Sequence, residues 1–156
     1  MIFVTLGSSK IAPMLDFARE VDRIAPHFDE KIIIQYGVTE YDFKNVEGIA
    51  YLDSNEMKEL LEKANIVVSH GGWGNLSTCI NMGKRLVAVP RKLGVEVNHD
   101  QLQLVKKLES LGCLIAVEDI GNLENAIRKA VLMDFNPLPR GNALPLIEEA
   151  LHDWKV

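Results

Sequence analysis

The stretch Ile66-Val67-Val68-Ser69-His70-Gly71-Gly72-Trp73-Gly74-Asn75 decides how this chain folds. Its apolar residues, ending at Ser69-His70, predict a buried strand, and the glycines predict a turn into a helix that runs to about residue 82. Glycine adopts positive φ easily and lets backbone N–H groups approach a ligand with no Cβ in the way. The start of such a helix suits an anion such as a diphosphate. A glycine turn also serves many parallel sheets as a simple change of direction, so both interpretations stand at this point.

The composition is that of an ordinary globular domain, with 156 residues of which 47% are hydrophobic and 25% charged. The net charge of −5 argues against a general nucleic-acid surface. No apolar run approaches the roughly 18 residues that span a bilayer, and the start Met1-Ile2-Phe3-Val4 is too short for a signal peptide. Cys79 and Cys113 stand alone, which fits a reducing compartment. We therefore expect a cytoplasmic protein that reaches a membrane only through a partner.

Short apolar runs alternate with helical patterns along the chain. The predicted strands cover 2–6, 31–36, 48–52, 66–70, 86–89 and 113–117. Between them, Ser9, Asp53 and Asn122 are predicted helix N-caps, and Asp53 with Glu56 has the form of a capping box. A stripe of Ile147, Ala150, Leu151 and Trp154 predicts a last helix, which either packs on the core or docks on a partner. This alternation predicts a Rossmann-like, doubly wound α/β fold with a parallel sheet.

Ligands of such sheets bind beyond the carboxyl ends of the strands. Here those ends carry Gly7-Ser8-Ser9, Gly37, Ser69 to Gly72 and Pro90-Arg91. Two of these four ends are polar, glycine-containing turns that lead into a helix. Their convergence at one edge indicates a site better than either turn does alone.

Several familiar sites have no counterpart in the sequence. There is no Gly-x-x-x-x-Gly-Lys-Ser/Thr, no Gly-x-Gly-x-x-Gly and no Gly-x-Ser-x-Gly. The four histidines lack metal-ligand spacing, and no Asp-x-Asp is present to chelate a metal. We therefore expect neither a metal nor a cofactor, and a diphosphate held by backbone amides remains the best fit.

Five segments together resemble the C-terminal domain of family 28 glycosyltransferases. They are Phe3-Val4-Thr5-Leu6-Gly7-Ser8-Ser9, Ser69 to Asn75, Gly83-Lys84, Val87-Ala88-Val89-Pro90-Arg91 and Asn98-His99-Asp100-Gln101-Leu102. The resemblance extends to about residue 133 and is greatest to the small donor-binding subunits of split enzymes. Those subunits are similar to the C-terminal half of the peptidoglycan N-acetylglucosaminyltransferase. One branch serves dolichol-linked oligosaccharides and another bacterial exopolysaccharides, and Pro90-Arg91 favours the bacterial branch.

This resemblance implies a GT-B C-terminal-type domain over residues 1–133, which binds a nucleotide-sugar, followed by a linker and C-terminal helix over 134–156. It implies an inverting transfer of a sugar from a UDP-sugar to a lipid-linked acceptor. The acceptor half would come from a membrane-bound partner subunit, so the chain would be peripheral at the membrane. The alternative is a non-catalytic module that binds a nucleotide-sugar. A sugar-phosphate epimerase would need a second domain for which residues 134–156 are too few.

The resemblance also implies roles for single residues. Gly71, Gly72, Gly74 and Asn75 would hold the diphosphate, with Gly7 and Ser8 near it or at the cleft mouth. His70 would face the sugar-phosphate and is the one local candidate for a catalytic base, although we expect the base on the partner. Arg91, His99 and Gln101 would contact the donor sugar or nucleotide.

Two positions depart from the family pattern. Many relatives have a ribose-binding Glu where this chain has Thr78, and they often read Asp-His-Gln where it reads His99-Asp100-Gln101.

Each residue also has a simpler interpretation from the sequence. His70 could bond a neighbouring carbonyl, Arg91 with Lys92 could be a solvated pair, and Gln101 could lie on an exposed helix face. Trp73 is either an exposed platform or a side chain folded over the sheet end.

Overall fold

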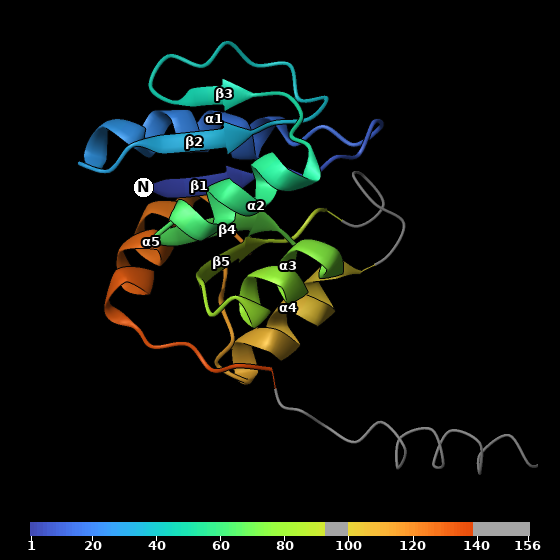
Figure 1. Ribbon diagram of the computed structural model, residues 1–156, viewed down its shortest axis with the longest axis vertical. Coiled ribbons are helices and arrows are strands. Elements are labelled where there is room, and N and C mark those ends of the chain that lie inside the picture. The colour runs from blue at the N-terminus through green and yellow to red at the C-terminus, as the bar shows by residue number, and fades with distance from the viewer. Residues whose placement is uncertain (93–99, 139–156) are drawn as a thin grey trace, which may run out of the picture.

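Six parallel strands form one sheet in the order β3-β2-β1-β4-β5-β6 (Figure 1). The computed structural model describes residues 1–92 and 100–138. The strands are β1 (Ile2–Thr5), β2 (Ile32–Gln35), β3 (Glu47–Ile49), β4 (Ile66–His70), β5 (Arg85–Val89) and β6 (Ile115–Ala116). The strand order reverses between β1 and β4, where Thr5 pairs with Ser69. In sheets of this kind, the carboxyl ends at such a reversal form the binding crevice.

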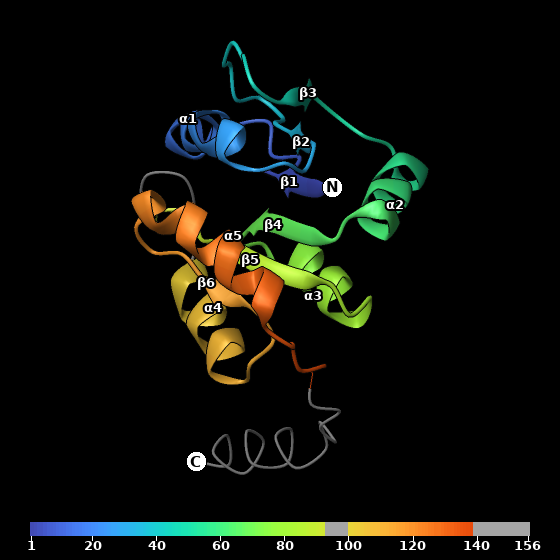
Figure 2. The same cartoon turned by 90° about the vertical axis from the view of Figure 1, so that its left-hand side faces the viewer.

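Helices cover both faces of the sheet, which confirms the doubly wound α/β fold. They are α1 (Leu15–Ile24), α2 (Ser54–Lys63), α3 (Trp73–Asn81), α4 (Gln101–Ser110) and α5 (Leu123–Leu132), with short 3-10 turns η1 (Ala25–His27) and η2 (Ile120–Asn122). Figure 2 shows α1 on one side of the strands and α2 and α3 on the other. The packing places α5 with α1 and places α4 with α2 and α3.

The central strands are buried on both faces, as their continuous apolar sequences predict. Val4 and Val68 point into the core under α1 and α5, whereas Phe3 and Val67 point into the core under α2, α3 and α4. All four side chains are fully buried, and each contributes about 1.5–3 kcal/mol of hydrophobic stabilisation. Two well-packed layers therefore hold β1 and β4 in a fixed register below the site.

The first helix begins later than the sequence predicts, and Ser9 is not its N-cap. Helix α1 starts at Leu15 after Met14, with no side-chain cap, and the backbone N–H of Met14 donates to Thr39 Oγ1 at 3.1 Å. Pro13 explains the difference, because a residue that precedes proline is disfavoured in the helical region. The chain therefore forms a loop from Gly7 to Met14 above the sheet edge.

The other predicted caps have different outcomes. The capping box of Asp53 and Glu56 is confirmed, since the Asp53 carboxylate accepts from the N–H groups of Asn55 and Glu56 while Glu56 reaches back to the Asp53 N–H. Asn122 precedes α5 as predicted, yet its side chain makes no capping hydrogen bond.

After α5 the chain returns along the end of α4. The backbone N–H of Asn136 donates to Gly112 O and its Nδ2 to Leu111 O, both at 2.9 Å. Residues 134–138 thus lie against the domain, while the predicted helix with Ile147 and Trp154 falls outside the described residues. Among residues 1–92 and 100–138, no helix combines the length and apolar character needed to cross a bilayer.

Replacing the cap residue in Asp53→Ala leaves the first turn of α2 without its acceptor. We expect a loss of about 1 kcal/mol in the free energy of unfolding, measured by urea denaturation. Asp29→Ala, which removes an exposed carboxylate that no helix uses as a cap, is the control and should change stability by less than about 0.5 kcal/mol. Equal effects of the two substitutions would contradict the capping role.

Candidate functional site

The imidazole of His70 lies between the loop after β1 and the turn after β4. A Cβ on Gly7 would stand 2.7 Å from His70 Cε1, and one on Gly72 would stand 2.4 Å from His70 Nε2. Gly7 also has φ +87°, a conformation that other residues rarely adopt. These two glycines are therefore required by the ring that lies between them, at the edge where the strand arrowheads end in Figure 1.

His70 is kept neutral in this position. Its pKa is lowered to about 4, first by burial and second by the positive charge of Arg91, with a small opposing effect from the nearby backbone carbonyl of Thr5. The buried Nδ1 atom makes no hydrogen bond of good geometry to any described group. The strand-end interpretation, in which His70 bonds a neighbouring carbonyl, has the Thr5 carbonyl as its candidate partner. A group with this pKa is a weak proton acceptor at neutral pH, so the site does not favour general-base catalysis by His70.

Gln101 is buried at the start of α4 and not on an exposed helix face. Only 5% of its surface is accessible, and a Cβ on Gly71 would stand 2.9 Å from Gln101 Oε1 and 3.0 Å from the Cα of Pro90. Asp100 caps this helix by accepting from the N–H groups of Leu102 and Gln103. Gln101 therefore packs directly over the turn that follows β4.

Arg91 is also buried, with 5% of its surface accessible. Its guanidinium donates to the backbone carbonyls of Leu6 and Ala12, and its backbone N–H donates to Gln101 Oε1 at 3.0 Å. Lys92 is exposed and forms an ion pair with Asp16 at 3.1 Å. The solvated-pair interpretation is therefore wrong for Arg91, whose guanidinium is buried against the loop after β1.

Helix α3 presents an open N-terminus at this edge. Its N-cap is Gly72, no side chain caps it, and its first turn holds no acidic residue. A Cβ on Gly74 would meet nothing within 4 Å, so the packing of the described residues gives no reason for a glycine there. Asn75 is half-buried and Ser8 is exposed. Trp73 is 51% exposed and is not folded over the sheet end, which leaves the platform interpretation.

The hydroxyl of Thr78 is turned back onto its own helix. It donates to Gly74 O at 2.8 Å, and the Ser77 hydroxyl donates to the same carbonyl at 3.1 Å. Thr78 therefore does not take the place of the ribose-binding carboxylate that many relatives have.

A buried polar cluster, not predicted from the sequence, holds the loop after β1. The Thr5 hydroxyl donates to Gln35 Oε1 at 2.6 Å and accepts from the Gly7 N–H at 3.2 Å. Gln35 Nε2 donates to Gly7 O at 3.0 Å and to Ala50 O at 3.2 Å. Gly37, with φ +59°, leaves room for the Gly7 carbonyl, since a Cβ there would stand 2.7 Å from it. The sequence signal that could have indicated this cluster is a polar residue at the end of each apolar strand, Thr5 and Gln35, shortly before a glycine.

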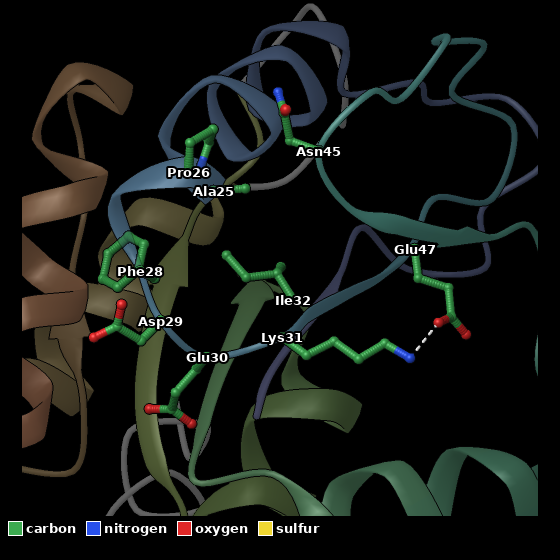
Figure 3. Close-up of a pocket in the computed structure, with 9 residues that line it drawn as sticks. All are labelled: Ala25, Pro26, Phe28, Asp29, Glu30, Lys31, Ile32, Asn45 and Glu47. Atoms are coloured by element: carbon green, nitrogen blue, oxygen red, sulfur yellow. Dashed lines mark ion pairs between the residues drawn. The ribbon is translucent and has the colours of Figure 1, made fainter.

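A separate hollow of about 520 Å³ lies at the amino end of β2 (Figure 3). Its rim is largely charged, and the close-up shows the ion pair of Lys31 with Glu47 across it. It is lined by Ala25, Pro26, Phe28, Asp29, Glu30, Lys31, Ile32, Asn45 and Glu47. Three carboxylates around one lysine make this hollow a poor match for a diphosphate, in contrast to the edge with Gly7 and Gly74.

The structure thus brings together Gly7, His70, Gly71, Gly72, Arg91 and Gln101, with Ser8, Gly74 and Asn75 on the rim. His99 lies outside the described residues. Within residues 1–92 and 100–138, no three His, Cys, Asp or Glu side chains are grouped so that they could hold a metal ion.

Comparisons with known proteins identify the family to which the chain belongs. The model of the glycosyltransferase family 28 C-terminal domain matches residues 1–150. UDP-glucuronosyltransferase 3A1 of Xenopus laevis is 24% identical over 159 residues, which cover 89% of this chain and 30% of that protein.

Solved structures share the fold at low sequence identity. The glycotransferase of kitacinnamycin has a TM-score of 0.66 at 21% identity over 97% of this chain and 37% of its own. ALG13 has a TM-score of 0.60 at 16% identity, over 96% of this chain and 94% of its own. The UDP-GlcNAc 2-epimerase of Methanocaldococcus jannaschii was solved with UDP-GlcNAc and UDP. It has a TM-score of 0.63 at 13% identity, over 97% of this chain and 45% of its own. The chain therefore spans about a third of the Xenopus protein and of the kitacinnamycin enzyme, and nearly all of ALG13.

The neutral state of His70 predicts a pH dependence of stability. The unfolded chain binds this proton with a pKa near 6.5 and the folded chain with a pKa of about 4, so the unfolded state binds more protons between those values. The free energy of unfolding should therefore fall as the pH drops from 6.5 to 4, by up to about 3 kcal/mol.

Urea denaturation at several pH values measures this effect, and the His70→Gln variant should lack it. His27→Gln, which removes an exposed histidine paired with Glu124, is the comparison and should keep the part of the slope that His70 causes. An NMR titration of His70 with a midpoint near 6.5 would contradict the buried, neutral state.

Proposed function

The chain belongs to the glycosyltransferase family 28 C-terminal domain family, and from this membership we propose that it is the donor-binding half of an inverting glycosyltransferase. The donor is a UDP-sugar, and the acceptor is a sugar linked to a lipid. The fold is that of GT-B C-terminal domains, and the reversal of strand order between β1 and β4 supports a donor site at that edge of the sheet. A membrane-bound partner subunit supplies the acceptor half.

One observation carries this proposal, namely the open space at Gly74 beside the uncapped start of α3. Gly7, Gly71 and Gly72 have neighbours within the chain that require a glycine, whereas Gly74 has none among the described residues. A diphosphate at this position would accept hydrogen bonds from the N–H groups of the first turn and would gain from the helix dipole. Gly74 is therefore a position where a ligand, and not the packing of the chain, accounts for the absence of a side chain.

The proposed reaction is a direct displacement at the anomeric carbon. The acceptor hydroxyl forms the new C–O bond, the bond between that carbon and the diphosphate oxygen breaks, and UDP leaves with the bonding electron pair. The start of α3 stabilises the charge that develops on the leaving diphosphate. A base on the partner subunit takes the proton of the acceptor hydroxyl, since His70 is too weak a base for this at neutral pH.

The size of the chain and the surface around the site support a half-enzyme. The chain spans 30% of the Xenopus protein and 37% of the kitacinnamycin enzyme, so these relatives contain much that this chain does not. Ile11, which is 91% exposed, and Trp73 both lie at the carboxyl edge of the sheet beside the site. Large exposed apolar side chains around a polar site are typical of a surface that another protein covers. In this arrangement the chain is cytoplasmic and peripheral at the membrane through its partner.

A non-catalytic module that binds a nucleotide-sugar is the second candidate function. It is favoured by Thr78, whose hydroxyl is bonded to Gly74 O and which offers no carboxylate to a ribose. Such a module would bind a uridine nucleotide and leave the rate of sugar transfer unchanged.

Calorimetric titration with UDP tests the donor site. We expect UDP to bind without magnesium, and Gly74→Asp to weaken binding by roughly tenfold or more, because a carboxylate beside the diphosphate repels it. Gly74→Asn is the matched control, since it has nearly the same shape without the charge, and it should retain more of the affinity. An acidic residue in the first turn favours a helix, so the melting temperature of Gly74→Asp should not fall. Equal loss of affinity in both variants would exclude the charge mechanism.

Sugar transfer tests the half-enzyme. Membranes from cells that lack this chain are incubated with radiolabelled UDP-sugars, and label in the lipid fraction is counted with and without the purified chain. We expect transfer only when membranes and chain are combined. Full-rate transfer to the extracted lipid by the chain alone would overturn the split arrangement, and UDP binding without any gain in transfer would favour the non-catalytic module.

A further inference from the structure

Arg91 connects three segments that border the candidate site. Its guanidinium donates to the carbonyl of Leu6, just before the loop after β1, and to that of Ala12, inside the loop. Its backbone N–H donates to Gln101 Oε1, at the first residue of α4. Arg91 is thus joined to Ala12 and Leu6, which precede it by 79 and 85 positions, and to Gln101, which follows it by 10 positions.

Gln101 extends this connection to the turn after β4. Its Oε1 and Cβ atoms lie so close to Gly71 that a Cβ there would stand 2.9 and 3.0 Å from them. Any displacement of Gln101 therefore changes the space available to the turn that runs through Gly72 into α3. A continuous chain of contacts leads from the loop at Leu6, through Arg91 and Gln101, to the start of α3.

We infer that Arg91 is a positioning residue that sets the gap between the loop at Gly7 and the turn at Gly71 to Gly74, without touching the donor itself. Gln101 acts in the same way, as the part of this connection that reaches the turn. The inference rests on the proposed function, because the donor diphosphate is proposed to lie beside this gap, at the open position of Gly74. It changes the roles of both residues from ligand contacts to supports of the loops that hold the ligand.

The chemistry of arginine suits this role better than that of lysine. A guanidinium presents several N–H donors in a planar fork, so it can hold two carbonyls at a fixed separation, whereas an ammonium is a single flexible point. The same burial that hides Arg91 from solvent lets its charge act on His70 through a medium of low dielectric. The fork and the charge are therefore separable properties, and substitutions can remove them one at a time.

Three variants of the full chain separate the two properties. Arg91→Lys keeps the charge and loses the fork, while Arg91→Met loses both. Arg85→Met is the matched control, because Arg85 is an exposed arginine at the start of β5, the strand that precedes Arg91. Urea denaturation of each variant shows whether it remains folded. Should Arg91→Met not fold, Gln101→Met takes its place in the binding and amide measurements, since it removes the acceptor of the Arg91 N–H and keeps the volume.

Two readouts follow these variants. Calorimetric titration with UDP should show binding weakened by roughly tenfold or more in both Arg91 variants and by less than about twofold in Arg85→Met. NMR titration should show the pKa of His70 unchanged in Arg91→Lys and raised in Arg91→Met, since only the second removes the charge. The affinity for UDP is thus expected to depend on the planar guanidinium, and the pKa of His70 on the positive charge. A general loss of stability would not separate these two effects.

The amide signals of Gly7 and Gly71 complete the test without any ligand. Both should shift in Arg91→Lys and neither in Arg85→Met, because the support of both loops is altered only in the first. UDP affinity in Arg91→Lys equal to that of the unmodified chain, or unshifted glycine amides, would overturn the positioning role. If the unmodified chain binds no uridine nucleotide, the proposed function fails, while the glycine amides still decide whether Arg91 couples the two loops.

Discussion

The packing of one imidazole between two glycines sets the geometry of this edge of the sheet. His70 ends β4, and its ring occupies the space between Gly7 and Gly72, so the loop after β1 and the turn after β4 cannot approach more closely there without moving it. The ring is buried and uncharged, which allows it to act as a packing group in a polar environment. The start of α3 is positioned by this contact, because Gly72 is its N-cap.

The glycines around the site are needed for different physical reasons. Gly7, Gly71 and Gly72 make room for His70 and Gln101, while Gly37 makes room for the carbonyl of Gly7. These positions are fixed by the chain itself and would be needed in the absence of a ligand. Gly74 alone in this group faces open space. The glycine-rich turn therefore contains positions at which the packing requires a glycine and one at which it does not, and the surroundings of each Cβ distinguish them.

Much of the fold could be predicted from the sequence, because it depends on local patterns. The apolar runs of β1, β2 and β4 and the capping box at Asp53 are contained within a few residues each. The turn after β4 was found in the same way. Ser9 was wrongly predicted as a cap because the constraint from Pro13 prevails over a favourable cap residue. The buried states of Arg91 and Gln101 and the cluster of Thr5 with Gln35 were not predictable, since each depends on partners that the folded sheet brings together across long stretches of sequence.

Arg91 bonds to the main-chain oxygens of Leu6 and Ala12 and not to their side chains. The support of the loop after β1 is therefore independent of which side chains the loop carries. Residues between those two anchors, such as Ser8, Lys10 and Ile11, are exposed and contribute little to the core. Such a loop can exchange its surface residues during evolution while its backbone keeps its shape. This separation of scaffold from variable positions marks the loop as a natural place for selection, or for protein engineering, to alter the surface beside the proposed site.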